Sequence, residues 1–240
     1  MITGILVALP DEISSLTSKN INKGDCISIN DKLLVCCSGA GPVNAKKASQ
    51  LLIDNGAERL ISWGCAAALS PDLQPGDLVL PEELLSEKTE QLSLHSSWLT
   101  FIKQQLSELS PLSGSLIESS TIVADCIDKQ RIYQKSSAIA LDMESIAVAT
   151  VAKENNMPAV VIRCIADPVD MNLPKSINYA MNNQGDIELP KLLYFLLSHP
   201  FELTGLIKLG LHFNKAKNKL KLVKKQLDII VGFEQKTGDQ

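Results

Sequence analysis

The sequence predicts an α/β protein with a mainly parallel or mixed sheet and helices on both faces. Apolar runs of strand length alternate with helical segments along the chain, which is the order typical of α/β folds. Several of these runs end in small residues or in acids, as strands do when they lead into a ligand site. With 240 residues, 45% of them hydrophobic and 21% charged, the chain is long enough for one large core.

The expected strands are short apolar runs bounded by turn-forming residues. Pro168 cannot donate a hydrogen bond within a sheet, so the last core strand must leave the sheet at Asp167. Residues 82–93 are polar and predict irregular structure. The strands that we expect span residues 2–9, 25–30, 33–37, 59–63, 78–81, 138–141 and 160–165, with short ones near 114–124.

Helices are expected between these strands. Pro10 opens the first one, and Asp11 and Glu12 place negative charge in its first turn, where the helix dipole favours it. Gly41 lies in a loop of small residues whose backbone N–H groups can approach an anion or a sugar. A tight turn that binds no ligand explains the same loop. The longer helices that we expect span residues 43–55, 96–108, 127–135 and 146–154.

Acids stand at three places where an apolar strand ends. Glu12 follows the first strand, and Asp167 ends the last one. Asp142 and Glu144 follow the strand before it. Carboxyl groups at such strand ends reach the crevice in which open α/β sheets bind ligands. The structural alternative is that Asp142 caps the next helix and Glu144 complements the dipole of that helix.

The cysteines and histidines argue against a metal site and against disulfides. The six cysteines form no C-x-x-C pair and the three histidines are scattered, so we expect neither a zinc site nor a disulfide framework. The first apolar run has no basic region before it and soon meets acids, unlike a signal peptide. These features predict a protein of the reducing cytoplasm.

Five motifs follow one another along residues 2–185. They are Gly4-Ile5-Leu6-Val7-Ala8-Leu9-Pro10-Asp11-Glu12, Ser38-Gly39-Ala40-Gly41-Pro42-Val43-Asn44-Ala45, Ser62-Trp63-Gly64-Cys65-Ala66 through Pro75-Gly76-Asp77, Leu141-Asp142-Met143-Glu144-Ser145, and Arg163-Cys164-Ile165-Ala166-Asp167. In this order they resemble the nucleoside phosphorylase family, nearest to its hydrolytic branch, the methylthioadenosine/S-adenosylhomocysteine nucleosidases. The resemblance implies a three-layer α/β/α sandwich with a central mixed sheet, an enzyme that cleaves purine nucleosides, and a homodimer.

Three downstream segments carry a narrower resemblance. Residues 165–170, 173–174 and 185–190 are similar to the hopanoid-associated phosphorylase subgroup, which removes adenine from adenosylhopane during hopanoid biosynthesis. That similarity implies a lipid-linked adenosyl compound as the substrate. The alternatives are a phosphate-dependent nucleoside phosphorylase and a nucleosidase for methylthioadenosine or S-adenosylhomocysteine.

The resemblance also assigns roles to individual residues. Asp167 is expected to protonate the purine at N7 as the general acid. Glu144 is expected to hold the ribose 2′ and 3′ hydroxyls, with Met143 against the sugar. Glu12 is expected to orient and deprotonate the attacking water, and Asp11 is the alternative if the turn at Pro10 shifts the register. The remaining expected substrate contacts are Gly41, Ala66, Ala67, Val123 and Ala124.

The scarcity of arginine favours water over phosphate as the nucleophile. Phosphorolytic relatives hold phosphate with arginines, and Arg59, Arg131 and Arg163 are the only arginines in the sequence. Arg59 precedes a strand and Arg163 lies within one, so neither is expected to face the ligand. The resemblance implies no cofactor, and phosphate is the alternative co-substrate.

The chain changes character after residue 190, so we expect a nucleosidase domain at 1–190 and a helical, basic, amphipathic extension at 191–240. Residues 203–227 hold seven lysines and no acid. Apolar residues recur there at steps of three and four, which marks one face of a helix.

Three alternatives remain for this extension. Its helix packs on the body or on a partner subunit, or it lies on the inner face of a membrane, because lysines near anionic lipid stabilise binding. A nucleic-acid arm is disfavoured, since no aromatic stacking pattern accompanies the charge. No apolar run of bilayer length exists, so the extension is not expected to span a membrane.

Overall fold

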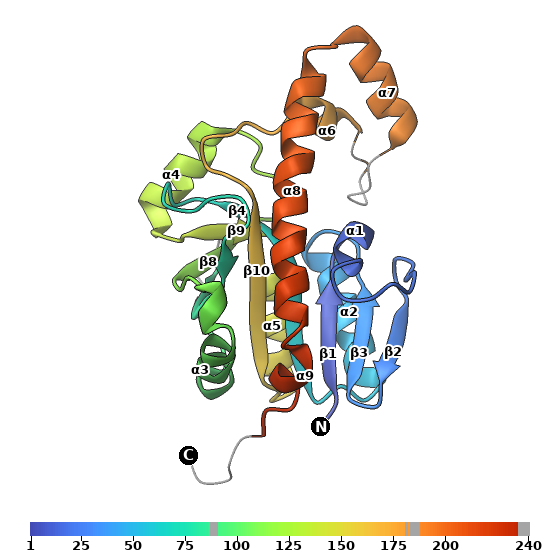
Figure 1. Ribbon diagram of the computed structural model, residues 1–240, viewed down its shortest axis with the longest axis vertical. Coiled ribbons are helices and arrows are strands. Elements are labelled where there is room, and N and C mark those ends of the chain that lie inside the picture. Colours follow the sequence, from blue (N-terminus) through green and yellow to red (C-terminus); the bar gives the residue numbers. More distant parts are fainter. Residues whose placement is uncertain (87–90, 181, 183–187, 235–240) are drawn as a thin grey trace.

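The computed structural model describes residues 1–86, 91–180, 182 and 188–234. It has three layers, a central sheet with helices on each of its two faces (Figure 1). In the described residues the middle layer is a sheet of ten strands, ordered β2-β3-β1-β4-β9-β8-β6-β7, with β10 pairing β4 and β5 off this path. The strands are β1 Thr3–Val7, β2 Cys26–Asn30, β3 Leu33–Cys37, β4 Arg59–Ala68, β5 Leu78–Val79, β6 Glu83–Leu85, β7 Gln91–Ser93, β8 Ser115–Glu118, β9 Ala140–Asp142 and β10 Ala159–Asp167. The predicted mixed α/β sheet is confirmed.

Strand β4 is the centre of the sheet because it pairs on both edges. It runs parallel to β1 on one edge and parallel to β10 on the other. Further along, β9 pairs antiparallel with the end of β4, at Ala67 and Ala68. The edge of β4 that β1 leaves at Trp63 is therefore taken up again by β9 only at Ala67.

Helices cover both faces of the sheet. Helices α2 (Pro42–Asp54) and α5 (Ser145–Glu154) pack against each other and on one face, and α8 (Glu202–Lys224), with α9 (Leu227–Ile230) and α3 (Ser96–Gln105), covers the other. Side chains alternate between these faces along each strand, so Leu60 faces α2 and α5 whereas Ile61 and Trp63 face α8. The remaining helices are α1 Pro10–Ile13, η1 Ser107–Leu109, α4 Cys126–Ser136, α6 Lys175–Ala180 and α7 Leu189–Ser198.

Two element predictions were wrong in detail. Strand β4 does not end at residue 63 but continues through the small residues to Ala68, because β9 and β10 pair with that stretch. The region 82–93, predicted to be irregular, contains β6 and β7, which pair with each other while β6 also pairs with β8. Alanine and glycine have low strand propensity, and in both regions the tertiary pairing decides the structure.

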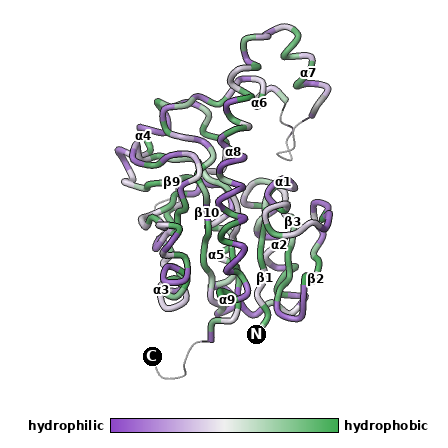
Figure 2. Tube along the Cα trace, viewed as in Figure 1, coloured by the Kyte–Doolittle hydropathy of each residue, from purple (hydrophilic) through white to green (hydrophobic). Residues whose placement is uncertain are grey.

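Helix α8 divides into two parts. Its second part buries Ala216, Leu220 and Val223 against the sheet. Its first part projects beyond the sheet together with α6 and α7, and this projecting end is rich in apolar residues (Figures 1 and 2). Of the helices in the described parts of the chain, none is both long and apolar enough to cross a bilayer.

Candidate active site

The candidate site lies along the edge of β4 between its pairing with β1 and its pairing with β9. In this gap the backbone N–H of Cys65 donates to Glu12 Oε1 at 2.7 Å instead of to a strand. A sheet edge left open by two departing strands is the usual place for a ligand in an open α/β fold. The predicted acids gather around this gap.

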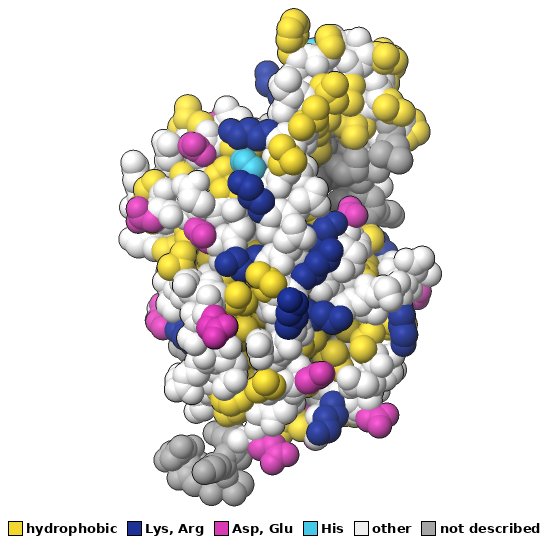
Figure 3. Space-filling view, viewed as in Figure 1, with side chains coloured by type: hydrophobic (Ala, Val, Ile, Leu, Met, Phe, Trp, Pro, Cys, Tyr) yellow, Lys and Arg dark blue, Asp and Glu magenta, His cyan; other side chains and the backbone are white. Residues whose placement is uncertain are grey.

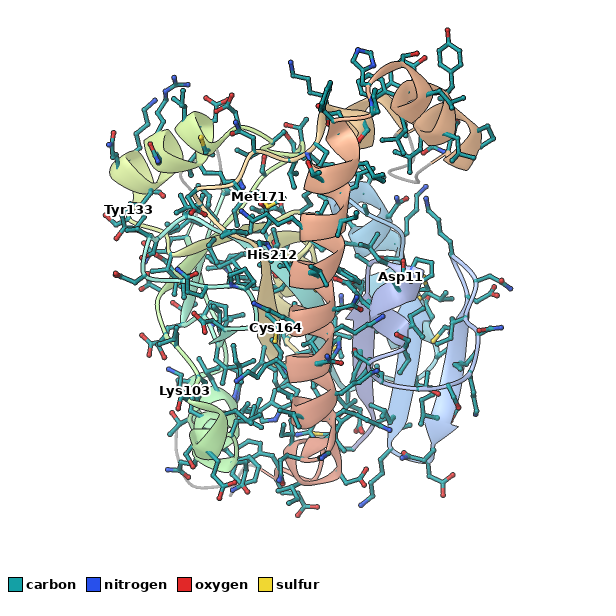
Figure 4. All side chains as sticks on the ribbon, turned by 45° about the horizontal axis from the view of Figure 1, so that its top comes forward. Asp11, Lys103, Tyr133, Cys164, Met171 and His212 are labelled. Atoms are coloured by element: carbon teal, nitrogen blue, oxygen red, sulfur yellow. The ribbon has the colours of Figure 1, made fainter. Side chains whose placement is uncertain are left out.

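Glu12 enters the gap from helix α1. Pro10 starts the helix directly after β1, and the Leu9 N–H donates to Glu12 Oε2 at 3.0 Å. The carboxylate fits because Gly64 has no side chain: a Cβ there would lie 2.8 Å from Glu12 Oε1. Burial raises the pKa of Glu12, and Arg163 opposes this. Asp11, the alternative base, is exposed and is labelled on α1 in Figure 4.

Glu144 stands at the start of helix α5 and is buried. Its Oε1 accepts from the Gly41 N–H at 2.8 Å, and its Oε2 accepts from the Met143 N–H at 3.3 Å. Burial, followed by the charge of Asp142, raises the pKa of Glu144 to about 7, and Arg163 lowers it. The N–H of Gly41 thus holds a carboxylate that interacts electrostatically with Glu12.

Asp142 and Arg163 form a buried ion pair behind Glu144. Arg163 Nε lies 2.6 Å from Asp142 Oδ2, and Arg163 Nη2 lies 3.9 Å from Glu144 Oε2. Asp142 Oδ1 also accepts from the Ser145 N–H at 3.2 Å at the start of α5, and the Ser145 hydroxyl donates to Oδ2. Glu144 holds the N-cap position of α5, but the side chain of Asp142 accepts from the first N–H of the helix, as its structural alternative proposed, and Arg163 neutralises its charge.

Asp167 is the last residue of β10, at an irregularity where the register against β4 shifts beside Ala67. Its Oδ2 lies 2.7 Å from Nζ of Lys129, a fully buried lysine of α4. Its Oδ1 is buried and has no hydrogen-bond partner in the part of the chain that the structure describes. Burial raises the pKa of Asp167 to about 6, and Lys129 acts against this rise.

The smaller residues predicted for the site lie on several elements. Ala66 and Ala67 belong to the stretch of β4 that pairs with the end of β10, and Met143 lies between Asp142 and Glu144. Val123 packs partly buried beside Leu141, and the carbonyl of Ala124 accepts from the Leu173 N–H at 2.9 Å. Within the described residues no three His, Cys, Asp or Glu side chains come together as a metal site requires.

This arrangement can both give and take protons. Three buried carboxyl groups, Glu12, Glu144 and Asp167, have raised pKa values, which places proton transfer near neutral pH within reach. The profile of the phosphorylase superfamily matches residues 3–184, well over half of the chain. The chain belongs to this superfamily.

Individual proteins that match the sequence of this chain support the assignment to the superfamily. The 5′-methylthioadenosine/S-adenosylhomocysteine nucleosidase of Buchnera aphidicola subsp. Baizongia pistaciae is 26% identical over 215 residues, which cover 75% of this chain and 83% of that protein. The enzyme of the same name from Staphylococcus epidermidis is 24% identical over 197 residues, covering 68% of this chain and 85% of that protein. The predicted family resemblance is confirmed.

Solved structures agree on the fold. Futalosine hydrolase of Helicobacter pylori has a TM-score of 0.71 at 17% identity, covering 95% of this chain and 97% of that one. A nucleosidase from Neisseria meningitidis in complex with methylthio-immucillin-A has a TM-score of 0.70 at 16% identity, covering 95% of this chain and 99% of that one. The fold predicted from the resemblance is confirmed, and the narrower hopanoid subgroup stays a prediction.

Two residues of the superfamily member's site were not anticipated. Arg163 was not expected to face the ligand, and no contact with the acids was predicted for it; it pairs with Asp142 and lies close to Glu144. A charged residue inside a buried strand needs a buried partner, and this was a usable signal. Lys129 lies in a polar stretch where nothing distinguishes it from the exposed lysines, so its burial follows only from the tertiary fold.

Proposed function

We propose that this chain cleaves the N-glycosidic bond of an adenosyl compound and releases adenine. The observation that supports this most is Asp167, a buried carboxyl group whose Oδ1 has no hydrogen-bond partner among the described residues. With its pKa raised to about 6 by burial, part of the population carries a proton near neutral pH. Protonation of the purine at N7 by Asp167 then makes the base a good leaving group.

Glu144 and Met143 bind the sugar in this proposal. Cleavage passes through an oxocarbenium-like ribose, which a nearby carboxylate stabilises. Glu144 is held by the N–H groups of Gly41 and Met143, and it accepts hydrogen bonds from the ribose 2′ and 3′ hydroxyls. The thioether of Met143 supplies an adaptable apolar contact to the sugar.

Glu12 is the base that deprotonates the attacking water. Its side chain is 3% exposed and held by two backbone N–H groups, whereas the neighbouring Asp11 is exposed. Burial raises the pKa of Glu12, which makes it a stronger base than an exposed carboxylate. Ala66 and Ala67 line the site beside the sugar, and the backbone of Val123 and Ala124 lies near the purine ring of the substrate.

Water is the favoured nucleophile because each of the three arginines is already engaged. Arg163 is bound by Asp142, Arg131 is exposed and pairs with Asp128 at 2.6 Å, and Arg59 binds carbonyls of residues 231 and 233. A phosphate site needs cationic donors that are free to bind the anion. Phosphate remains the alternative co-substrate, as in a nucleoside phosphorylase.

Adenine release is the direct test. The purified chain is incubated with methylthioadenosine and with adenosylhopane, with and without phosphate, and free adenine is followed by chromatography. We expect release without phosphate. Release that requires phosphate would show that the chain is a phosphorylase. Turnover of methylthioadenosine alone would show that its substrate is a soluble nucleoside. No release from either compound would refute the proposal.

A lipid-linked adenosyl compound, adenosylhopane, is the substrate that we propose. The three segments that resemble the hopanoid subgroup motivate this choice, although residues 185–187 of the last one lie outside the described part of the chain. The projecting end supports it: Leu197 is 84% exposed and Phe201 90% exposed, at the turn between α7 and α8. Figure 3 shows apolar side chains gathered over α6 and α7, and lysines along α8 below them.

The same surface is where we propose contact with a membrane. The second part of α8 uses its apolar face to pack on the sheet, so that face is not available to lipid. The exposed apolar side chains of α7 and the first part of α8 are available, and insertion of such residues into the interface stabilises peripheral binding. They are Leu193, Tyr194, Leu197, Phe201, Leu203, Ile207 and Leu211.

Cosedimentation with vesicles tests the membrane contact. We expect the full chain to sediment with vesicles of phosphatidylcholine and phosphatidylglycerol, and the double variant Leu197→Ser/Phe201→Ser to stay in solution. The matched control is Ile127→Ser, which removes an apolar side chain that is 61% exposed on α4. Equal sedimentation of the double variant and the wild type would refute the contact. The predicted homodimer is checked on the same samples by sedimentation equilibrium.

A further inference from the structure

Lys129 is the one buried residue of helix α4. Its ammonium group makes three contacts: Asp167 Oδ2 at 2.7 Å, the Met171 carbonyl at 2.8 Å and the Pro168 carbonyl at 3.0 Å. An ammonium has three hydrogens to donate, so all three are used. Burial of a lysine is costly unless it is paired, and this site pairs it fully.

These contacts distinguish the two oxygens of Asp167. Oδ2 accepts a hydrogen bond from a cation, so a proton on the carboxyl group is placed on Oδ1. Oδ1 is the oxygen that is buried without a partner in the described residues. The proton of Asp167 therefore sits on the oxygen that is free to meet a ligand.

The contacts also join two segments at the site. The carbonyls of Pro168 and Met171 belong to the turn that follows β10, and Lys129 belongs to the helix that follows Val123 and Ala124. In Figure 4 Met171 is labelled near His212 of α8. Lys129 thus anchors α4 to Asp167 and to the turn that follows it.

We propose that Lys129 is the positioning residue of Asp167, fixing the carboxyl group so that Oδ1 bears the transferred proton and Oδ2 is stabilised as the proton leaves. The inference rests on the proposed role of Asp167 as the acid. A cation next to the carboxylate stabilises the form that remains after proton transfer, which strengthens the acid. Lys129 acts through Asp167 and does not itself touch the substrate.

Other charged groups near the acid act in smaller ways. Asp170 lies close enough to raise the pKa of Asp167, but its effect on that pKa is smaller than the effects of burial and of Lys129. From α8, His212 interacts with Asp170, and burial together with Lys208 and Lys215 lowers the pKa of His212. Lys129 is the only cation in the described residues that forms an ion pair with Asp167.

The test is a carboxyl titration that needs no turnover. The full chain is labelled with ¹³C at the aspartate carboxyl carbons, and Asp167→Asn identifies the Asp167 signal. In Lys129→Met we expect the titration midpoint of Asp167 to move to higher pH by about one unit or more, roughly a tenfold weaker acid. Lys135→Met, an exposed lysine on the same helix, is the matched control and should leave the midpoint unchanged.

Catalysis gives a second readout. The alkaline limb of kcat/KM for adenine release should move to higher pH in Lys129→Met, and the change should add no further loss in the Asp167→Asn background. Lys129→Gln is used if the Met variant does not fold. An unmoved midpoint, or failure of both variants to fold, overturns the proposal. If the wild type releases no adenine, the proposed function fails while the titration still decides the role of Lys129.

Discussion

The sheet buries one arginine near each end, and the two are bound by different acceptors. At the end where β4 begins, Arg59 donates to Thr3 Oγ1 at 2.8 Å, to the Phe233 carbonyl at 2.7 Å and to the Val231 carbonyl. Its guanidinium also lies 4.6 Å from the ring centroid of Trp98. Arg59 ties the carboxyl-terminal segment to the sheet through uncharged partners.

Arg163, towards the opposite end, is bound by acids. It pairs with Asp142 at 2.6 Å, lies 3.9 Å from Glu144 and interacts with Glu12. Burial removes both arginines from water at a cost in free energy. The carbonyl and hydroxyl oxygens that bind Arg59 do not titrate, whereas the carboxylates around Arg163 can accept protons. A buried charge thus serves stability where its partners are neutral, and can serve chemistry where its partners titrate.

The largest effect that we expect is the loss of activity in Asp167→Asn, at the acidic end of this comparison. Asparagine has the shape of aspartate but no proton to transfer, so kcat should fall by about 10² to 10⁴. Adenine release under single-turnover conditions measures it, with Asp228→Asn on the surface of α9 as the control. Unchanged kcat in Asp167→Asn would mean that another group is the general acid.

Next in size is a loss of stability in Arg59→Met, at the neutral end. The change leaves Thr3 and two carbonyls without their donor, so the free energy of unfolding should fall by about 3 kcal/mol. Activity of the folded fraction should not change, because Arg59 is remote from the acids. Urea unfolding measures the effect, and Arg131→Met, which breaks an exposed pair, should cost no more than about 1 kcal/mol. Equal losses in both variants would show that the buried contacts of Arg59 contribute no more stability than an exposed ion pair.

The sequence predicted the acidic end better than the neutral end. Strands ending in Glu12, Asp142, Glu144 and Asp167 were visible because apolar runs stop abruptly at carboxylates. Two of the three hydrogen-bond partners of Arg59 could not be found in this way, because they are backbone carbonyls more than 170 residues further along the chain. Backbone acceptors leave no mark in a sequence.

The alternation of strands and helices was also predictable, because it depends on local apolar periodicity. The extension of β4 to Ala68 and the strands β6 and β7 were missed since they form by pairing with distant strands. Lys129 was missed for a related reason. The helix that holds it is largely polar, and Lys129 is buried because it packs on the turn after β10 and donates to two carbonyls there.

A smaller effect should follow from Gly64→Ala, which displaces one acid of the site without removing it. The new methyl group would lie 2.8 Å from Glu12 Oε1, so the carboxylate must move. A displacement of about 1 Å at a reacting group can cost about a hundredfold in rate. Gly210→Ala is the matched control, because a Cβ there meets no atom within 4 Å and alanine favours the helix. Equal activity of the two variants would show that Glu12 tolerates displacement.

The smallest effect that we expect is a dependence of stability on pH that belongs to the acidic end alone. Burial, followed by Asp142, raises the pKa of Glu144 from 4.5 to about 7, so between these values the folded chain holds a proton that the unfolded chain has lost. Stability contributed by such a group is present at low pH and is lost as the pH rises through this window. The raised pKa values of Glu12 and Asp167 act in the same direction.

Glu144→Gln isolates this contribution, because glutamine does not titrate. The free energy of unfolding of the variant should gain on that of the wild type by about 1 kcal/mol or more between about pH 5 and about pH 8, since one pKa unit corresponds to about 1.4 kcal/mol. Urea unfolding at several pH values measures the difference, and Arg131→Met should run parallel to the wild type. If Glu144→Gln also runs parallel, Glu144 does not titrate in this window. The two ends of the sheet would then differ in their partners but not in the proton chemistry that we attribute to them.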